Sequence, residues 1–325
     1  MRLSTDAAPH FRTNDTTQKI MLDVLIALTP AVIVSTWIFG LRALFIMLFS
    51  MVFAEVLEYV TVKFLKKQKD FKPDFSASVT GLLLGMNLSL GVNWWQIMIG
   101  VVVSILIAKH AFGGLGQNFF NPALVGRVFL MISFPTAMTT WYQPFYYKSP
   151  SIMTAASPLS MLSEQGIDQV LSNYSYWEMF VGKIPGSIGE VSALALIIGF
   201  IYLLVRNRVK VMIPLSYIGT VVVFSSILYF VDPIKFGNPL FHILTGGLML
   251  GALFMATDMV TTPMTPKGEF VFGVGAGVLT ILIRSFGGYP EGVSFSILIM
   301  NAFVPLIDDW LKPRIYGTSK GGAEN

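Results

Sequence analysis

The residues best suited to covalent chemistry lie in a hydroxyl-rich stretch near the middle of the chain. Residues 151–159 read Ser-Ile-Met-Thr-Ala-Ala-Ser-Pro-Leu, so Thr154 and Ser157 are three positions apart and a proline follows Ser157. A serine or threonine hydroxyl is a nucleophile that can carry a covalently attached group. The residue types alone favour a simpler interpretation, which is an exposed turn whose hydroxyls bond to the nearby backbone.

A second candidate site consists of two acidic residues within apolar sequence. Glu55 and Glu58 are three positions apart and therefore share one face of a helix. Ionisable residues within membrane spans are costly and usually functional, so the pair could belong to an ion pathway or could bind a cationic group. Four further acidic residues lie near the expected ends of spans, where water can solvate them: Asp23, Asp258, Asp308 and Asp309.

A third pattern is a glycine-interrupted motif that occurs twice. Thr80-Gly81 lies in Val-Thr-Gly-Leu-Leu-Leu-Gly, and Thr245-Gly246 lies in Leu-Thr-Gly-Gly-Leu-Met-Leu-Gly. Each motif is followed by an apolar stretch and then by a Phe-Gly-Gly sequence. Matching interrupted segments in two halves of a membrane protein indicate an internal repeat with a binding site between the halves. The same glycine spacing also permits close helix packing, and the sequence leaves both interpretations open.

Composition places these residues in a membrane protein. Of 325 residues, 54% are hydrophobic and 12% are charged, whereas a soluble domain has roughly 25% charged residues. No cysteine is present, which excludes disulfides and thiolate-bound metals or iron–sulfur clusters within this chain. The three histidines are far apart in sequence, so we predict no metal site. The basic residues are grouped by loop, and we predict no nucleic-acid binding.

The elements that must position these residues are about ten transmembrane helices in an all-α polytopic fold. The candidate segments are about 20–40, 42–62, 75–91, 94–111, 122–140, 191–205, 211–231, 238–256, 270–284 and 292–311. We expect two inverted five-helix repeats, with the third and eighth helices broken at their glycines. Residues 1–140 form the first repeat, 141–190 an external loop, and 191–325 the second repeat.

The distribution of positive charge predicts the orientation. Most of the 22 Lys and Arg residues fall in segments on the same side as the N-terminus, and positive residues favour the cytoplasmic side. We therefore expect a multi-pass protein of the inner, cytoplasmic membrane with both termini in the cytoplasm and the 141–190 loop outside.

Several motifs together resemble a known family. The chain is similar to the family that contains the D subunit of the Rnf complex and the B subunit of the sodium-pumping NADH:quinone reductase. The resemblance covers nearly the whole length, and the short N-terminal segment favours the Rnf branch. The motifs that carry it are 17–21 (TQKIM), 112–123 (FGGLGQNFFNPA), 186–192 (GSIGEVS), 254–258 (FMATD), 289–292 (YPEG) and 300–302 (MNA).

The resemblance implies two flavins. Members of the family carry FMN through a phosphoester on the last residue of a Thr/Ser-Gly-Ala-Thr sequence, which corresponds here to Ser157, with Thr154 as the second candidate. This chain departs from the pattern because Ala155 replaces the glycine and Ser157 replaces the threonine. The second flavin, non-covalent and expected to be riboflavin, would lie within the helix bundle. Its candidate contacts are Thr80, Gly81, Asn118, Asn121, Thr245, Gly246 and Asp258.

The function that follows is a membrane electron carrier. As part of an oxidoreductase that transfers electrons from ferredoxin to NAD⁺, the chain would move electrons through flavins across the membrane, coupled to Na⁺ or H⁺ translocation. The resemblance implies the A, B, C, E and G subunits of the Rnf complex as partners, with the ferredoxin and NAD⁺ sites on those partners. The alternatives are a component of a quinone reductase, or a small-solute channel or transporter built from inverted repeats.

Overall fold

The computed structural model describes residues 15–67, 72–148, 154–288 and 291–312. Within them, five helices are long and apolar enough to cross a membrane: Thr17–Phe39, Leu41–Phe64, Met212–Val231, Pro266–Phe286 and Val293–Trp310. A sixth candidate is a bent pair, Pro233–Leu244 with Leu248–Met255. The fold is therefore that of a mostly helical polytopic membrane protein. The count of ten crossings stays a prediction, because the remaining apolar helices are shorter than a full span.

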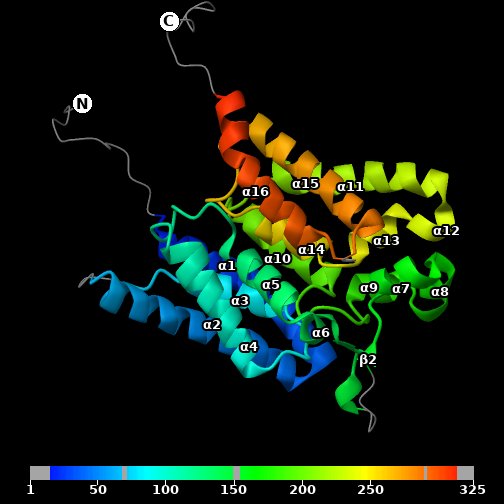
Figure 1. Cartoon of the computed structure of the whole chain (residues 1–325), viewed down its shortest axis with the longest axis horizontal. Coiled ribbons are helices and arrows are strands. Elements are labelled where there is room, and N and C mark those ends of the chain that lie inside the picture. Colours follow the sequence, from blue (N-terminus) through cyan, green and yellow to red (C-terminus); the bar gives the residue numbers. More distant parts are fainter. Residues whose placement is uncertain (1–14, 68–71, 149–153, 289–290, 313–325) are drawn as a thin grey trace, which may run out of the picture.

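The helices of the first half lie together on one side of the molecule, shown in blue to cyan at the lower left of Figure 1. They are α1 (Thr17–Phe39), α2 (Leu41–Val60) with its π-helical extension η1 (Thr61–Leu65), α3 (Ser76–Met86), α4 (Trp94–Val102) with the π-helical η2 (Val103–His110), α5 (Pro122–Ser133) and α6 (Pro135–Thr139).

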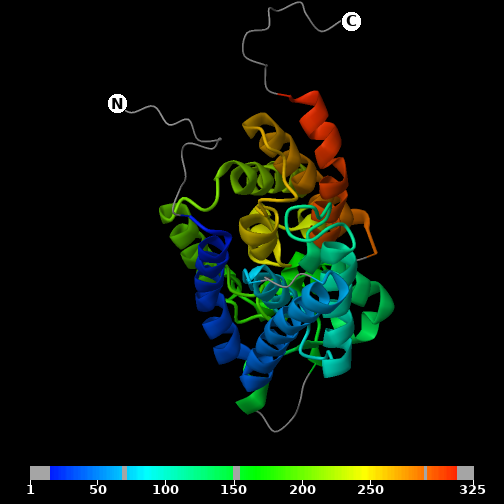
Figure 2. The same ribbon diagram turned by 90° about the vertical axis from the view of Figure 1, so that its left-hand side faces the viewer.

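The helices of the second half form the other side, and Figure 2 shows α11, α15 and α16 stacked above α1 and α2. They are α10 (Ala193–Val205), α11 (Met212–Val231), α12 (Pro233–Phe236), α13 (Pro239–Leu244), α14 (Leu248–Leu250) with the π-helical η4 (Gly251–Met255), α15 (Pro266–Phe286) and α16 (Val293–Trp310).

A region of short elements joins the two halves. It contains β1 (Trp141–Tyr142), the 3-10 turn η3 (Tyr146–Lys148), β2 (Thr154–Ala155), α7 (Pro158–Gln165), α8 (Ile167–Asn173) and α9 (Tyr176–Val181). The two strands pair antiparallel, with Trp141 opposite Ala155. This region lies at the lower right of Figure 1.

The helix termini gather at two opposite ends. At the first, which we call the inner end, Arg206 and Arg208 after α10 pair with Asp23 near the start of α1. Lys210 before α11 pairs there with Glu269 in the first turn of α15. At the second, the outer end, the backbone N–H of Phe145 donates to the carbonyl of Ile38 near the end of α1. The region of short elements lies at this outer end.

The break predicted in the eighth segment is present. Gly246 and Gly247 have φ of +66° and +68°, values that glycine adopts without the penalty of a Cβ atom, and the chain bends by 46° between the flanking helices. In the third segment, α3 begins after Phe75, whose φ is also positive, and it ends at Met86. The predicted break at the glycines of the third segment is wrong, because Thr80-Gly81 lies inside the continuous helix α3. Thr245-Gly246, in contrast, forms the break of the eighth segment.

Candidate functional site

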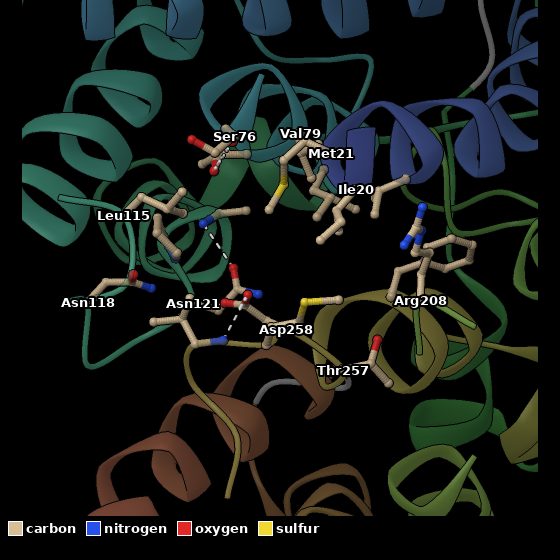
Figure 3. A pocket seen from close by; sticks show the side chains of 18 of the residues that line it. Ile20, Met21, Ser76, Val79, Leu115, Asn118, Asn121, Arg208, Thr257 and Asp258 are labelled. Atoms are coloured by element: carbon tan, nitrogen blue, oxygen red, sulfur yellow. Dashed lines mark hydrogen bonds between the residues drawn. The ribbon is translucent and has the colours of Figure 1, made fainter. Parts of the chain in front are cut away.

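A cavity lies between the two halves toward the inner end, and we call it the inner cavity. Its free space is about 820 Å³ when the part that is open to solvent is included. Its walls come from α1, α3, the end of η2, the 115–123 segment, the end of α10 and the 254–260 segment. Figure 3 shows Ile20, Met21, Ser76 and Val79 along one wall, with Asn118, Asn121 and Asp258 across from them. Four predicted contacts line the inner cavity: Thr80, Asn118, Asn121 and Asp258.

The asparagines of the inner cavity also shape its walls. The Asn121 side-chain oxygen accepts hydrogen bonds from the backbone of Ala123 and Leu124, which makes Asn121 the N-cap of α5. Its amide nitrogen donates to the carbonyl of Met255, 3.1 Å away, so one side chain joins the two halves. Asn118 donates to the carbonyl of Phe120 at 3.1 Å.

Asp258 has a similar turn-forming role. Its carboxylate accepts hydrogen bonds from the Val260 backbone at 3.5 Å and the Thr261 hydroxyl at 3.1 Å. It is only partly buried, and Figure 3 places it beside Asn121. These bonds fix the rims of the cavity and leave some of the acceptor capacity of the carboxylate free for a ligand.

A buried ammonium group stands in the wall of the inner cavity. Lys109 is 1% exposed. Its Nζ lies 2.6 Å from Glu58 Oε1 and 2.6 Å from Ser76 Oγ. The same Glu58 oxygen lies 3.1 Å from His110 Nε2. Glu58, one of the two acidic residues singled out in the sequence, is thus the common partner of two basic side chains.

Arg208 lines the inner cavity at its side toward α10. Its guanidinium binds Asp23 at 2.7 Å and Asp15 at 3.0 Å. The hydrogen bond from Arg208 holds the pKa of the Asp15 carboxyl below its ordinary value. The start of α1 is therefore tied to the end of α10 beside the cavity.

Glu55 and Gly81 serve the packing of α2 against α3. Glu55 Oε2 accepts hydrogen bonds from the Ser78 backbone at 3.1 Å and from its hydroxyl at 2.7 Å, within the first turn of α3. A Cβ atom on Gly81 would lie 2.8 Å from the Cβ of Ala54 and would overlap the Ser50 carbonyl. Close helix approach therefore explains this glycine. Neither residue lines the inner cavity.

A smaller cavity, the outer pocket, lies toward the outer end, and its free space is about 320 Å³ when the part that is open to solvent is included. Ser157, Gly246, Glu190 and Glu291 all line it. The predicted attachment residue and the second glycine motif therefore meet here, away from the other predicted flavin contacts. A Cβ atom on Gly247 would lie 2.5 Å from the Glu190 carboxylate, so the carboxylate lies against the break in the chain.

Ser157 occupies the N-cap of α7. Its Oγ accepts a hydrogen bond from the Ser160 backbone at 3.2 Å and lies 2.9 Å from the Ser160 hydroxyl. Ser157 is 5% exposed, whereas Thr154 in β2 is exposed. An anionic group on Ser157 would stand at the positive end of an eight-residue helix, where phosphate is favoured.

Thr245 lies beneath Arg284. The Arg284 guanidinium donates to the carbonyl of His242 at 2.7 Å and to those of Thr245 and Gly246 at 2.9 and 2.8 Å. These carbonyls are at the C-terminal end of α13, where a cation is favoured. The hydroxyl of Thr245 donates to the carbonyl of Phe241. Arg284 thus satisfies the backbone that the break exposes.

The centre of the molecule holds an arginine that the sequence patterns did not single out. Arg127 of α5 is 2% exposed. Its guanidinium lies 2.6 Å from Glu190 and also binds Glu291, and it donates to Asn87 and Ser294 at 2.5 and 2.9 Å. The partners come from both halves and from the segment before α10.

Two signals in the sequence could have identified this cluster. Arg127 is a lone cation in an apolar stretch, a pattern that usually marks a functional or pairing residue. Glu190 and Glu291 lie in two of the motifs that carry the family resemblance. Lys109 was equally visible as a cation at the end of a span.

The comparison with known proteins agrees with the membrane fold and the motifs. The model of the NQR2, RnfD, RnfE family matches residues 4–317. The D subunit of the proton-translocating ferredoxin:NAD⁺ oxidoreductase complex of Clostridium ljungdahlii is 44% identical over 97% of this chain and 96% of its own. The D subunit of the Na⁺-translocating complex of Acetobacterium woodii is 42% identical over 98% of this chain and 97% of its own.

A third relative, with a lower identity, is also a D subunit. The D subunit of an ion-translocating oxidoreductase complex of Salmonella typhi is 36% identical over 97% of this chain and 98% of its own. The chain therefore belongs to the NQR2, RnfD, RnfE family.

Proposed function

We propose that this chain is the D-type membrane subunit of an Rnf-type ferredoxin:NAD⁺ oxidoreductase and carries electrons between two flavins. The observation that carries the proposal is a pair of cavities. One lies between the two halves toward the inner end, and the other lies toward the outer end between the 157–191 segment and the second half. One contains polar residues expected to contact a flavin, and the other contains the expected attachment residue. Near full-length similarity to named D subunits supports the assignment.

The residue types that line the inner cavity suit an isoalloxazine ring. Cofactor sites are largely apolar clefts with a few fixed polar groups, and the lining of this cavity has that character. Met21, Leu83 and Phe254 supply apolar surface, while Asn118 and Asn121 supply polar groups. When bound, the flavin supplies one-electron and two-electron redox chemistry, and the protein orients it and excludes water.

We assign the tethered FMN to Ser157 at the outer pocket. The backbone N–H groups at the start of α7 would bind the phosphate oxygens, and the pocket beside Ser157 is lined by Gly246 and Gly247. Ser157 must give up its present N-cap bond to Ser160 on attachment, and a phosphate oxygen can take over as acceptor.

The same proposal includes ten membrane crossings in two inverted repeats. Among the described residues, the nine apolar helices and the bent pair overlap the ten predicted segments. Ion pairs group the start of α1 with the end of α10 at one end, as expected when the two halves enter from opposite sides. The chain would lie in the inner membrane with its Rnf partners, and the complex would move Na⁺ or H⁺.

The test is the flavin content of the complex purified from its own membranes. Flavin fluorescence of this chain in a denaturing gel reports the covalent FMN, and acid extraction followed by chromatography reports the non-covalent flavin. We expect both. Asn121→Leu should lower the extractable flavin and leave gel fluorescence unchanged, and Asn173→Leu, on the exposed side of α8, is the matched control. A wild-type chain without either flavin would favour a solute channel.

A further inference from the structure

Lys109 combines three properties that packing does not require. The side chain is buried, it lines the inner cavity, and it uses two of its three N–H groups on Glu58 and Ser76. A lysine side chain has only donors, and an ammonium buried in apolar surroundings costs several kcal/mol unless it is paired. A methionine would fill the same space without that cost. The charge therefore calls for a role beyond packing.

Glu58 and His110 continue from Lys109 as a series of titratable groups, the titratable series, that leads away from the cavity. Glu58 Oε1 is 2.6 Å from the ammonium and 3.1 Å from His110 Nε2. Neither Glu58 nor His110 lines the inner cavity. Glu58 Oε2 and His110 Nδ1 are buried and have no hydrogen-bond partner among the described residues. The unpaired Glu58 Oε2 and His110 Nδ1 are therefore both available to take part in a proton transfer.

His110, the last group of the titratable series, lies just under the protein surface at the inner end. A Cβ atom on Gly114 would lie 3.7 Å from His110 Nδ1 and 3.3 Å from Lys66 Nζ, so His110 faces the underside of this loop. Gly113 in the same loop is exposed. Imidazole is the side-chain group that exchanges protons with water most readily at physiological pH, and here it stands closest to the surface.

Other charged groups face Lys109, Glu58 and His110 from neighbouring elements. Asp74 binds Ser76, the second partner of Lys109, from the loop before α3. Asp258 from the 254–260 wall and Arg208 from the end of α10 line the same cavity as Lys109. Lys66 lies over the His110 end. Carboxylates therefore balance the charge of the Lys109 ammonium from both sides, and Glu58, 2.6 Å away, is in position to pass a proton to its Nζ.

We propose that Lys109 delivers a proton to the ligand of the inner cavity when that ligand is reduced, and that Glu58 and His110 return the proton from the inner end. The proposal rests on the proposed function, because it takes the ligand to be a flavin. An electron arrives from reduced ferredoxin through the complex. The Nζ–H bond of Lys109 breaks and its proton bonds to a ring nitrogen of the flavin, leaving a neutral amine.

The Lys109 amine then regains a proton through Glu58 and His110. His110, protonated from water at the inner end, passes a proton to the Glu58 carboxylate, and Glu58 passes it to Lys109 Nζ. The flavin gains one electron and one proton, the water at the inner end loses one proton, and all three side chains return to their starting states. Positioned proton donors contribute roughly 10²–10⁴-fold to such steps.

The experiment measures the rate of flavin reduction in the intact complex by stopped-flow absorbance, with reduced ferredoxin as donor, in H₂O and in D₂O. The variants are Lys109→Met, Glu58→Gln and His110→Gln. The matched control is Lys63→Met, an exposed lysine near the same end. We expect each of the three variants to reduce the flavin about tenfold or more slowly and with a larger solvent isotope effect, because proton transfer becomes limiting.

The outcomes separate this proposal from the proposed function. A wild-type complex without extractable flavin overturns the proposed function, and the proton route falls with it. A wild-type complex that holds the flavin, together with variants that retain it and react at the wild-type rate in both solvents, overturns the proton route alone. If Lys109→Met loses the flavin, the reduction rates of His110→Gln and Glu58→Gln test the proton route instead, since neither residue lines the cavity.

Discussion

Arg127 and Ser157 show how much a single side chain can decide in a membrane protein. Arg127 binds Glu190 and Glu291, which are 63 and 164 positions away, so one guanidinium holds segments from both halves. Ser157 is buried as the N-cap of a helix, although its sequence suggests an exposed turn. In both cases the partners of the residue determine its role.

Removing the Arg127 charge should destabilise the protein strongly. Arg127→Met leaves two carboxylates buried without their cation, and breaking such an arrangement costs about 3–5 kcal/mol. We expect a large fall in the thermal midpoint of the detergent-solubilised complex. The triple variant Arg127→Met with Glu190→Gln and Glu291→Gln should recover part of the loss. Arg206→Met, at a partly exposed ion pair, should change the midpoint little.

The hydroxyl that carries the predicted FMN can be identified by substitution. Ser157→Ala should abolish flavin fluorescence of the denatured chain, because no covalent link survives. Ser157→Thr should retain the fluorescence, since the hydroxyl is kept. Thr154→Ala is the matched variant in the same stretch and should reduce attachment only indirectly. Fluorescence that persists in Ser157→Ala and disappears in Thr154→Ala would assign the link to Thr154.

At the scale of elements, the fold depends on close contact between the segment before α10 and the end of α3. The backbone N–H groups of Ile188 and Gly189 donate to the carbonyls of Leu88 and Met86, at 3.0 and 2.7 Å. These bonds satisfy backbone at the end of α3, where the helix itself leaves carbonyls unpaired. A Cβ atom on Gly189 would lie 2.6 Å from Met86 side-chain atoms.

Gly189→Ala should therefore loosen this contact. The added methyl group overpacks the interface, which costs about 1–3 kcal/mol. We expect a lower thermal midpoint and faster proteolysis of the 182–192 segment. Gly219→Ala is the matched control, because a Cβ atom there has no neighbour within 4 Å among the described residues. Equal midpoints for the two variants would contradict the role assigned to this contact.

At the scale of the whole molecule, the charge distribution and the grouping of helix termini both distinguish the inner end from the outer end. The inner end contains Lys63, Lys66, Arg206 and Arg208, and the outer end contains the region of short elements. Basic residues favour the cytoplasm, so the inner end is predicted to face it.

Single-cysteine labelling tests this orientation, and the native chain has no cysteine to interfere. We expect an impermeant maleimide added to whole cells to label a cysteine placed at Ser163, which is exposed in α7. It should fail to label one placed at Lys67, which is exposed beyond η1, until the membrane is opened. The reverse pattern would place the inner end outside the cell.

The sequence alone was sufficient for the class of protein and the family. Apolar segment lengths, the low share of charged residues and the paired glycine motifs are local properties, and hydropathy must match the bilayer wherever a helix contacts lipid. The membrane class, the break near Gly246 and the family resemblance could accordingly be predicted from these patterns. The motif at 118–121 also pointed to residues that line the inner cavity.

Only the tertiary structure decided which residues meet. Of the predicted flavin contacts, Thr80 and Asn121 line one cavity and Gly246 lines the other, because the first glycine motif lies inside a helix and the second forms a break. The pairing of Lys109 with Glu58 depends likewise on how η2 packs against α2. A side-chain pattern fixes the face of a helix, but the partner of a buried charge depends on the packing of segments that are distant in sequence.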